Sequence, residues 1–404
     1  MSTCVKLILL TGPGKQQHAA CNHPCPCNDH EPHLDSLLLL LKQKLGFFGR
    51  RFISQPFSMN FECIHTFGQS GVRGNFNHQF NFPTSLAISY QYSFVFICDS
   101  FNDRILIFDL CSREFRKSFR IMGNSERPRF LCMEEERMNG DVALIVGCGV
   151  FENFTFYKLD VNKNLSLEMN QSSSSNIKPD LTRSNLNNNN KNSSSSGQVC
   201  EMNYIWKSMN RSIKSMQGMS ISSYYHQLFV CDKSSTPCVH VLNSNNGDYL
   251  ERIEMDYYPS SIELFHHWNN RHDEQVLIIC DTQHVISIFQ RISFPKRRNY
   301  EPGSVQTNSF RNHNQWKRLK KFSIQNSSKL TIASTNMIVD RASNTLIISD
   351  FLQNCIRIYS LETGELLKEF GQDHLIHPQG LTLNELNGEL MVCDTSNHRV
   401  LVFK

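Results

Sequence analysis

A unit of three short strands at the end of the chain recurs upstream, and this repetition restricts the possible folds more than any other feature of the sequence. Residues 378–404 contain two apolar strands joined by an Asn-Gly dipeptide, which favours a tight hairpin turn, and a third strand follows. Pro378 precedes Asp394 by 16 residues, and Pro83 precedes Asp99 by the same 16. The same unit is therefore present near the start of the chain.

Four further copies complete the series. Two keep the 16-residue spacing with the proline replaced, and two are longer between the first and second strands, one of these with glycine in place of the acid. In chain order they run Pro128 to Gly147, Met216 to Asp232, Pro259 to Asp281 and Ser334 to Asp350. A period of roughly 40 residues with short strands and turns indicates a repeat architecture and not two unrelated domains.

The predicted fold is all-β, a six-bladed β-propeller of four-stranded antiparallel blades. The second strand of each copy, for example residues 94–98, is apolar on both faces, as expected for a sheet packed between two others. Residues 61–68 read as a fourth strand that lacks the rest of its copy. We expect this strand to pair with residues 399–403, so that three C-terminal strands and one N-terminal strand close the ring and leave no open edge.

The sequence divides into a tail at residues 1–60 and a propeller at residues 61–404. The tail matches no repeat, and we expect it to be disordered or to form one short helix. Two insertions interrupt the propeller, a Ser/Asn-rich stretch at 162–197, expected to be disordered, and a basic stretch at 294–315. The long insertions follow first or third strands and so share one face. The opposite face, here called the turn face, carries the short turns between second and third strands.

Composition by itself excludes few functions. A formal net charge of +4 and a pI near 8.3 are too mild to indicate nucleic acid or an anionic membrane. No apolar run approaches the roughly 18 residues of a membrane span. Several of the 15 cysteines lie inside apolar strands, as Cys98 and Cys393 do, which indicates reduced and buried thiols. We expect a cytoplasmic protein without a membrane span, and a monomer.

The tail contains a cluster of residue types that bind zinc, namely Cys21, His23, Cys25 and Cys27. Their alternating spacing lacks the Cys-x2-Cys pairs of a zinc knuckle, and no second half of such a site follows within the segment. These four residues are candidate ligands, but the prediction is a protein with no metal and no other cofactor. The acids of the repeats recur after every second strand, which favours a role in capping turns over a catalytic one.

The order of residues in the copies resembles the NHL repeat, with Pro-x-Gly, an apolar strand before Asp, then x-x-Asn-x-Arg and a further strand. Copy one keeps Asn102 and Arg104 but has Ser85 for the glycine, and copy five has Cys355 where the arginine is expected. The resemblance covers residues 61–404. The last copy matches most fully, through Pro378, Gly380, Asp394, Asn397, Arg399 and Phe403.

The resemblance implies a function in macromolecular recognition. Propellers of this family mostly hold partners: proteins in ubiquitin ligases of the tripartite-motif type, single-stranded RNA in some of those, and peptides elsewhere. One enzymatic branch, the peptidyl-amidoglycolate lyase, is similar in fold and places zinc-binding histidines just after the repeat proline. The equivalent positions here hold no histidine, which argues against the lyase; they are Thr84, Arg129, Ser260 and Gln379.

We therefore expect a non-catalytic scaffold that binds a protein partner through the turn face, as a substrate receptor in ubiquitin-dependent degradation. Binding of single-stranded RNA is the alternative, and a metal-dependent lyase of the amidating type is a disfavoured second one. The partner-binding candidates are turn residues: Asn102, Arg104, Lys233, Asn397, His398 and Arg399. The RNA-binding candidates are basic residues near aromatic ones, a combination that suits single strands: Arg73, Arg127, Arg129, Arg211 and Lys214.

Overall fold

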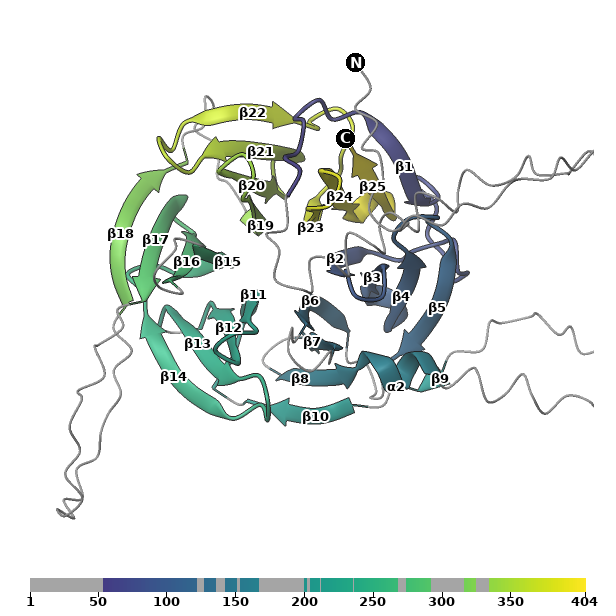
Figure 1. Cartoon of the computed structure of the whole chain (residues 1–404), viewed down its shortest axis with the longest axis horizontal. Helices are drawn as coiled ribbons and strands as arrows, with labels where there is room; N and C mark the ends of the chain where they lie inside the picture. The colour runs from purple at the N-terminus through teal and green to yellow at the C-terminus, as the bar shows by residue number, and fades with distance from the viewer. Residues whose placement is uncertain are drawn as a thin grey trace, which may run out of the picture.

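Six sheets stand around a central axis in the computed structural model (Figure 1). Five sheets have four strands and one has five. The structure describes residues 54–121, 127–135, 142–150, 153–166, 200–201, 204–210, 212–234, 236–267, 274–291, 316–324 and 334–404. This is an all-β propeller with six four-stranded antiparallel blades, so the predicted fold class is confirmed.

Blades 1 to 3 follow the chain from the inner strand to the outer one. Blade 1 consists of β2 (Pro83–Ser89), β3 (Phe94–Asp99), β4 (Arg104–Asp109) and β5 (Phe115–Arg120), with a short parallel strand β9 (Cys200–Glu201) outside β5. Blade 2 consists of β6 (Pro128–Glu135), β7 (Val142–Val150), β8 (Asn153–Asp160) and β10 (Tyr204–Met209). Blade 3 consists of β11 (Met216–Ser222), β12 (Gln227–Asp232), β13 (Cys238–Asn243) and β14 (Tyr249–Glu254).

Blades 4 and 5 continue in the same order, whereas blade 6 combines strands from both ends of the described chain. Blade 4 consists of β15 (Pro259–His267), β16 (Glu274–Asp281), β17 (Val285–Arg291) and β18 (Trp316–Ser323). Blade 5 consists of β19 (Ser334–Asp340), β20 (Thr345–Asp350), β21 (Cys355–Ser360) and β22 (Leu366–Phe370). Blade 6 consists of β23 (Pro378–Asn384), β24 (Glu389–Asp394), β25 (Arg399–Phe403) and β1 (Cys63–Gly68).

The strand β1 lies beside β25 in Figure 1, the first in purple and the second in yellow. The two strands pair antiparallel, with Phe67 opposite Val400 and Gly68 opposite Arg399. The Phe67 side chain is buried against Phe108 of blade 1, with 4.8 Å between the ring centroids. The outer edge of β25 is therefore covered by backbone pairing and by an aromatic contact with the next blade.

The strand register agrees with the counted repeats in five of the six copies. In these copies the first residue of the inner strand faces the acid at the end of the second strand, as in Pro83 opposite Asp99 and Pro378 opposite Asp394. Blade 2 differs, because Pro128 pairs with Cys148. A bulge follows the first residue of the inner strand in all six blades, so the difference lies in the longer hairpin between β6 and β7. Cys148 therefore stands at the position of the acid. The sequence had predicted Gly147 there.

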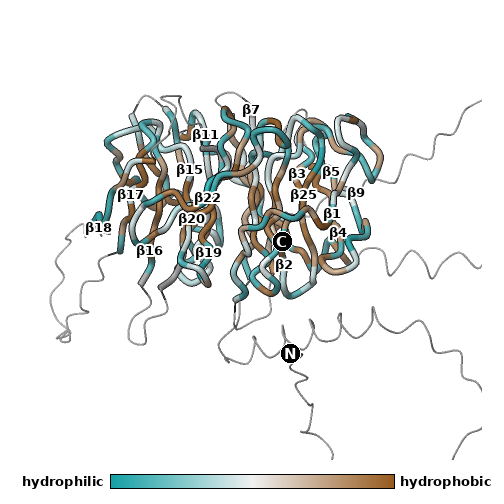
Figure 2. The backbone as a smooth tube through the Cα atoms, turned by 90° about the horizontal axis from the view of Figure 1, so that it is seen from above, coloured by the Kyte–Doolittle hydropathy of each residue, from teal (hydrophilic) through white to brown (hydrophobic). Residues whose placement is uncertain are grey.

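The hydrophobic core of the described chain is divided into clusters that each lie between two neighbouring blades. On β3, Val95 and Ile97 pack toward blade 6, whereas Phe96 and Cys98 pack toward blade 2. This alternation explains why the second strands are apolar on both faces. Figure 2 shows the result, with hydrophobic segments through the middle of the disc and hydrophilic ones toward its edges. Burial of one such phenylalanine stabilises the fold by about 1.5–3 kcal/mol.

The packed domain begins before residue 61. Phe57 and Phe61 are only 3% and 5% exposed, and both pack between blades 5 and 6. The Phe61 ring stacks on Phe370 at 4.3 Å between centroids, and the main-chain N–H of Phe57 donates to Asp340 at 2.9 Å. Residues 54–60 therefore belong to the propeller and not to the predicted tail. The remainder of that tail, with its candidate zinc ligands, lies outside the described residues.

The start of the first predicted insertion is helical. The short helix α2 (Val161–Ser166) covers the first residues of the stretch 162–197 that the sequence predicted to be disordered. Its Asn164 is buried, and the main-chain carbonyl of Asn164 accepts a hydrogen bond from Lys117 Nζ of β5 at 2.9 Å. This contact holds the turn of helix against blade 1. The rest of that insertion, residues 167–197, and the basic stretch 294–315 lie outside the described residues.

Ten cysteines lie in the described part of the chain, and none of them forms a disulfide. Eight are buried, among them Cys98, Cys231, Cys280 and Cys393 of the second strands. Burial raises the pKa of the Cys98 and Cys393 thiols. These cysteines are thus the buried free thiols that the sequence indicated. In the same described part, no helix has the length and apolar character needed to cross a membrane.

Candidate functional site

The turn after β3 is organised by the carboxylate of Asp99. This acid is fully buried and is followed by the 3-10 turn η1 (Ser100–Asn102). It accepts hydrogen bonds from the Asn102 side chain at 2.8 Å, from Arg104 Nε at 2.7 Å and from the main-chain N–H of Asn81 at 2.6 Å. Burial raises the pKa of Asp99, and the Arg104 charge and these hydrogen bonds oppose that rise. Asn102 is thus part of the internal structure of the turn.

Arg104 joins this turn to the connection that leads into blade 1. Besides the ion pair with Asp99, its guanidinium donates to the main-chain carbonyls of Asn75, Phe76 and Gln79 at 2.6, 3.0 and 3.0 Å. The residue is 5% exposed. Arg104 is therefore an internal cross-link and is not available to a partner, which corrects the prediction that it lies on the binding surface.

The turn after β24 repeats this arrangement in a more open form. Asp394 is followed by the 3-10 turn η2 (Thr395–Asn397) and accepts from Asn397 at 2.9 Å and from Arg399 Nε at 2.7 Å. Arg399 also donates to the main-chain carbonyl of His374 at 2.9 Å, and its side chain is 18% exposed. Asn397 and Arg399 therefore act first within the turn, and only the rim of the Arg399 guanidinium reaches solvent.

Blade 5 keeps the ion pair although the repeat arginine is missing. Cys355 stands opposite Asp350 at the position of that arginine. Arg357, two residues further along β21, points to the same face of the strand and binds the Asp350 carboxylate. Its Nε also donates to Glu369 at 2.6 Å. The departure that the sequence showed at Cys355 is thus compensated by a cation from the next position on that face.

In blade 3, as in blade 5, the residue that pairs with the acid lies two positions beyond the expected arginine, and here it is a histidine. Cys238 stands opposite Asp232, and His240 Nε2 lies 3.1 Å from Asp232 Oδ2 and 3.4 Å from Cys238 Sγ. Burial by itself lowers the pKa of His240, but the hydrogen bonds to Asp232 and Cys238 raise it to about 9. The imidazole therefore carries a positive charge at neutral pH and takes the place of the arginine.

A row of ring side chains follows the turn face across blades 5, 6 and 1. His377 stacks on Phe351 at 4.3 Å, and Phe82 contacts His398 at 4.8 Å and Phe101 at 4.7 Å between centroids. The row continues to blade 2, where the Arg127 guanidinium lies 4.2 Å from the centre of the Phe101 ring. We call these residues the aromatic strip: Phe351, His377, His398, Phe82, Phe101 and Arg127.

The basic candidates from the sequence are spread over this face. Arg73, Lys214 and Lys233 are exposed, Arg129 is half-buried, and Arg211 lies outside the described residues. Burial lowers the pKa of Arg129. Arg73 lies close enough to His398 for its charge, together with burial, to lower the pKa of that imidazole. The structure thus brings Arg73 and Arg127 to the aromatic strip, whereas Lys214 and Lys233 lie at blade 3.

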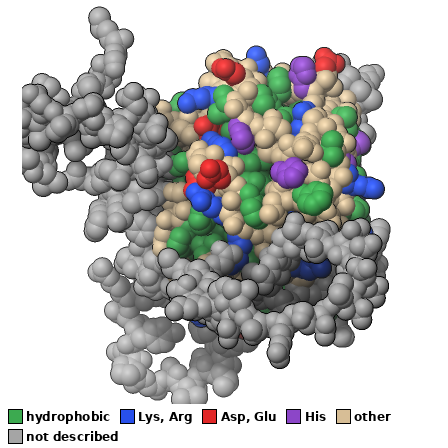
Figure 3. Space-filling view, turned by 90° about the vertical axis from the view of Figure 1, so that its right-hand side faces the viewer, with side chains coloured by type: hydrophobic (Ala, Val, Ile, Leu, Met, Phe, Trp, Pro, Cys, Tyr) green, Lys and Arg blue, Asp and Glu red, His purple; other side chains and the backbone are tan. Residues whose placement is uncertain are grey.

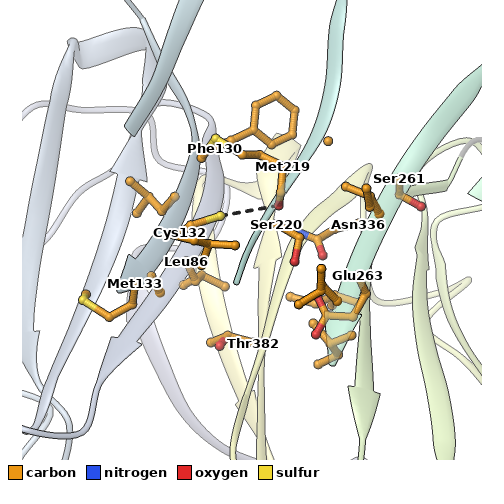
Figure 4. Close-up of a pocket in the computed structure, with 18 of the residues that line it drawn as sticks. Leu86, Phe130, Cys132, Met133, Met219, Ser220, Ser261, Glu263, Asn336 and Thr382 are labelled. Carbon is orange, nitrogen blue, oxygen red and sulfur yellow. Dashed lines mark hydrogen bonds between the residues drawn. The ribbon is translucent and has the colours of Figure 1, made fainter. Parts of the chain in front are cut away.

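The centre of the ring holds a cavity of about 250 Å³. Its described lining comes from the inner strands and is mostly apolar, with Glu263 as its one carboxylate (Figure 4). Burial raises the pKa of Glu263 to about 8, although the charge of Arg341 and two main-chain hydrogen bonds oppose the rise. The sequence reasoning missed Glu263. The available signal was a single acid within the apolar inner strand at 259–267.

Replacing Glu263 with glutamine is expected to flatten the pH dependence of stability. The carboxyl has a pKa of about 8 in the folded chain against an ordinary value of 4.5. Stability from this group is therefore fully present below pH 4.5 and is lost as the pH rises through 8. Glutamine keeps the shape without ionising, so above pH 8 the E263Q variant should be more stable, by up to about 5 kcal/mol.

Urea unfolding at a series of pH values measures this difference. Glu114→Gln is the matched control, because the Glu114 side chain is 69% exposed and should leave the pH profile unchanged. Equal pH slopes for E263Q and the unmodified protein would mean that Glu263 ionises as an ordinary surface carboxyl does.

The fold and this face define a propeller with a compact surface of turns and ring side chains on one side. Residues 375–403 match the NHL repeat. The match covers the last blade, and the six blades together with it make the chain similar to NHL-repeat propellers. No curated protein sequence matches the chain.

Two solved structures resemble the chain at low sequence identity. The crystal structure of the Myceliophteria thermophila Cps50 (Swd1) β-propeller domain is 9% identical with a TM-score of 0.49, and the match covers 85% of this chain and 99% of that one. The crystal structure of the mitotic checkpoint complex contains a chain that is 12% identical with a TM-score of 0.49, and the match covers 98% of this chain and 99% of that one. At this identity the likeness does not extend to function.

Proposed function

We propose that the protein is a non-catalytic scaffold that binds a protein partner through the turn face. The observation that carries this proposal is the group of exposed rings beside the internal ion pairs of the turns. Phe76 is 58% exposed and Phe101 47% exposed, and Arg73 and Arg127 border them. Large apolar side chains with arginine at their border are typical of recognition surfaces and cost solubility where they have no partner.

The charges on this face favour a protein over a nucleic acid. Arg73 and Lys233 are exposed there, but Asp103 and Asp256 lie on the same face, so the positive charge is interrupted. A nucleic acid presents a continuous row of phosphates and is best matched by a continuous basic surface. The rim beside blade 1 has the same mixed character, with acidic, basic and histidine side chains interspersed (Figure 3). A partner segment with apolar side chains and a few acids suits the face best.

Single-stranded RNA is the second candidate, and one observation favours it. The Arg127 guanidinium stacks over the exposed Phe101 ring at 4.2 Å, an arrangement that can hold an unpaired base. The resemblance to tripartite-motif propellers supports a finer role, that of substrate receptor for a separate ubiquitin-ligase subunit. A cytoplasmic location is proposed on the basis of the buried free thiols.

The triple substitution F76A/F101A/R127E is expected to reduce recovery of the partner at least tenfold, because a few central aromatic and arginine side chains carry most of the energy of an interface. Full-length protein and variant are used as bait in living cells, and bound proteins are quantified by mass spectrometry. The matched control is Tyr224→Ala, which removes a ring that is 61% exposed on the turn between β11 and β12, at the opposite face.

Recovery of the same partners at the same level from the triple variant would reject the turn face as the binding site. The RNA candidate is tested with the same proteins by filter binding at two salt concentrations. Micromolar binding of single-stranded RNA at low salt that the triple variant loses would favour RNA over protein. A ubiquitin-ligase role requires in addition that the recovered partner becomes less stable when the protein is overproduced, and that the triple variant does not have this effect.

A further inference from the structure

Blade 3 contains a buried cluster of three side chains that bind metals. The ligand atoms of Asp232, Cys238 and His240 all lie within 4.8 Å of one another. The three residues are 0%, 1% and 3% exposed. A carboxylate, a thiol and an imidazole form a ligand set typical of zinc. This cluster plays no part in the aromatic strip, so any role it has is independent of the proposed recognition function.

The hairpin of β12 and β13 fixes the three ligands in place. Cys238 is the direct cross-strand partner of Asp232, so both side chains project from the same face of the sheet. His240 is two residues further along β13 and projects from that face as well. The backbone pairing therefore brings the three groups together before any ion binds, and little conformational entropy has to be lost on binding.

The distances suit a tetrahedral ion. Zinc binds nitrogen and oxygen at about 2.0 Å and sulfur at about 2.3 Å, so in a tetrahedral site a nitrogen and an oxygen ligand are about 3.3 Å apart and a nitrogen and a sulfur ligand about 3.5 Å apart. His240 Nε2 lies 3.1 Å from Asp232 Oδ2 and 3.4 Å from Cys238 Sγ. These separations agree with the tetrahedral ones to within about 0.2 Å, so small side-chain adjustments are enough to admit the ion.

The hydrogen bonds from the main chain to Asp232 favour one of its two oxygens, because Oδ2, the oxygen that faces His240, accepts only a longer one, from Lys214 at 3.3 Å. Oδ1 accepts the main-chain N–H of Ser215 at 2.7 Å and that of Lys214 at 3.2 Å. These bonds orient the carboxylate in the way that outer hydrogen bonds orient metal ligands. The neighbouring turn residues Lys233 and Thr236 are exposed, so the cluster lies directly beneath the turn face and an ion has a short path to it.

Blade 5 shows that the fold itself does not need this ligand set. There, too, a cysteine stands opposite the acid, but the second residue along the strand is Arg357, which neutralises Asp350 and cannot bind a metal. In blades 1, 5 and 6 an arginine supplies a positive charge beside the buried acid. In blade 3 the position equivalent to that of Arg357 holds an imidazole, which can ligate a metal, and the Cys238 thiol lies 3.4 Å away.

We propose that Asp232, Cys238 and His240 bind one Zn²⁺ ion in blade 3, with water or the nearby Ser234 hydroxyl in the fourth position. The ion takes over the positive charge that arginine supplies in blades 1, 5 and 6. On binding, His240 releases its Nε2 proton and Cys238 releases its thiol proton to solvent, so that both offer a lone pair to the metal. The site is a structural one that clamps β12 to β13 beneath the turn face.

The substitution H240R tests metal binding apart from the ion pair with Asp232. It recreates the arrangement of blade 5, in which an arginine neutralises the acid but cannot bind a metal. Full-length protein is produced in zinc-supplemented medium, and its zinc content is measured by inductively coupled plasma mass spectrometry. The unmodified protein is expected to hold one more zinc per chain than H240R, while circular dichroism shows both to be folded. C238S should lose the same ion. Equal zinc contents in the unmodified protein and H240R would overturn the proposal.

A second measurement needs no substitution in blade 3. The tail variant C21S/C25S/C27S removes the thiols of the other candidate ligands. In this background one equivalent of Co²⁺, which takes tetrahedral zinc sites, should give the charge-transfer absorption of a cobalt–thiolate bond, and adding C238S should abolish it. Absence of that absorption, or its persistence with C238S, would overturn the proposal whether or not H240R folds.

Discussion

Replacement of Arg104 with alanine is expected to lower the free energy of unfolding by about 3–5 kcal/mol, the range measured when one partner of a buried ion pair is removed. The variant leaves the Asp99 carboxylate fully buried without its counter-charge. It also removes the donor to three main-chain carbonyls of the connection into blade 1. Since burial already raises the pKa of Asp99, loss of the arginine should raise it further and make the variant less unstable in acidic than in neutral solution.

Urea denaturation followed by circular dichroism measures this effect. Two substitutions serve as controls. Lys233→Ala removes an exposed cation from the same face and should change the free energy of unfolding by less than about 0.5 kcal/mol. Arg104→Lys keeps the charge but cannot reproduce the several donors of the guanidinium, so an intermediate loss is expected. A loss below about 1 kcal/mol for R104A would contradict the structural role and make the residue a surface candidate again.

The number of blades and most of the strand register could be predicted from the sequence, because the spacing between repeat residues fixes the length of each hairpin. A residue such as Pro83 can face Asp99 only if a hairpin of fixed length lies between them, and the same spacing recurs along the chain. The spacing was misleading in blade 2, where the hairpin is longer and no acid ends the second strand, so that Pro128 faces Cys148 and not Gly147. Without the acid as a marker, a count along the chain cannot tell which residue of an apolar strand faces the proline.

The candidate site was predictable only in part, because burial depends on segments distant in sequence. The turn containing Asn102 and Arg104 was recognised as a charged motif, but its carbonyl partners come from the connection at 75–79, which no pattern places over it. The aromatic strip likewise joins Phe82 to His398, residues 316 positions apart. Such proximity arises from closure of the ring.

The sequence also gave no indication that His240 pairs with the acid of blade 3. The repeat pattern places an arginine at one fixed position, whereas in the structure the next residue on the same strand face can supply the cation. Arg357 does so in blade 5 and His240 in blade 3. Strand alternation makes positions two apart equivalent in direction. A repeat pattern that allows this displacement of two residues includes both Arg357 and His240.

Removal of β1 is expected to produce the largest change of all, loss of the monomeric folded state. The comparison is between chains that begin at residue 54 and at residue 69. The shorter chain leaves the backbone groups of β25 without partners along its outer edge, and it lacks the Phe67 ring that packs against Phe108. An unpaired strand edge binds other chains, so the shorter protein should aggregate. Size-exclusion chromatography with light scattering measures the outcome.

A chain that begins at residue 63 separates the contribution of the aromatic residues from that of the strand. It lacks Phe57 and Phe61, which are nearly fully buried, but keeps β1. It should remain monomeric with a free energy of unfolding several kcal/mol lower, since loss of one buried phenylalanine side chain costs about 3–5 kcal/mol. A monomeric chain starting at residue 69, with stability within about 1 kcal/mol of the one starting at residue 63, would show that the ring does not depend on β1. Aggregation of the shortest chain alone would assign the closure to the backbone pairing of β1 with β25, since the two chains differ only by that strand.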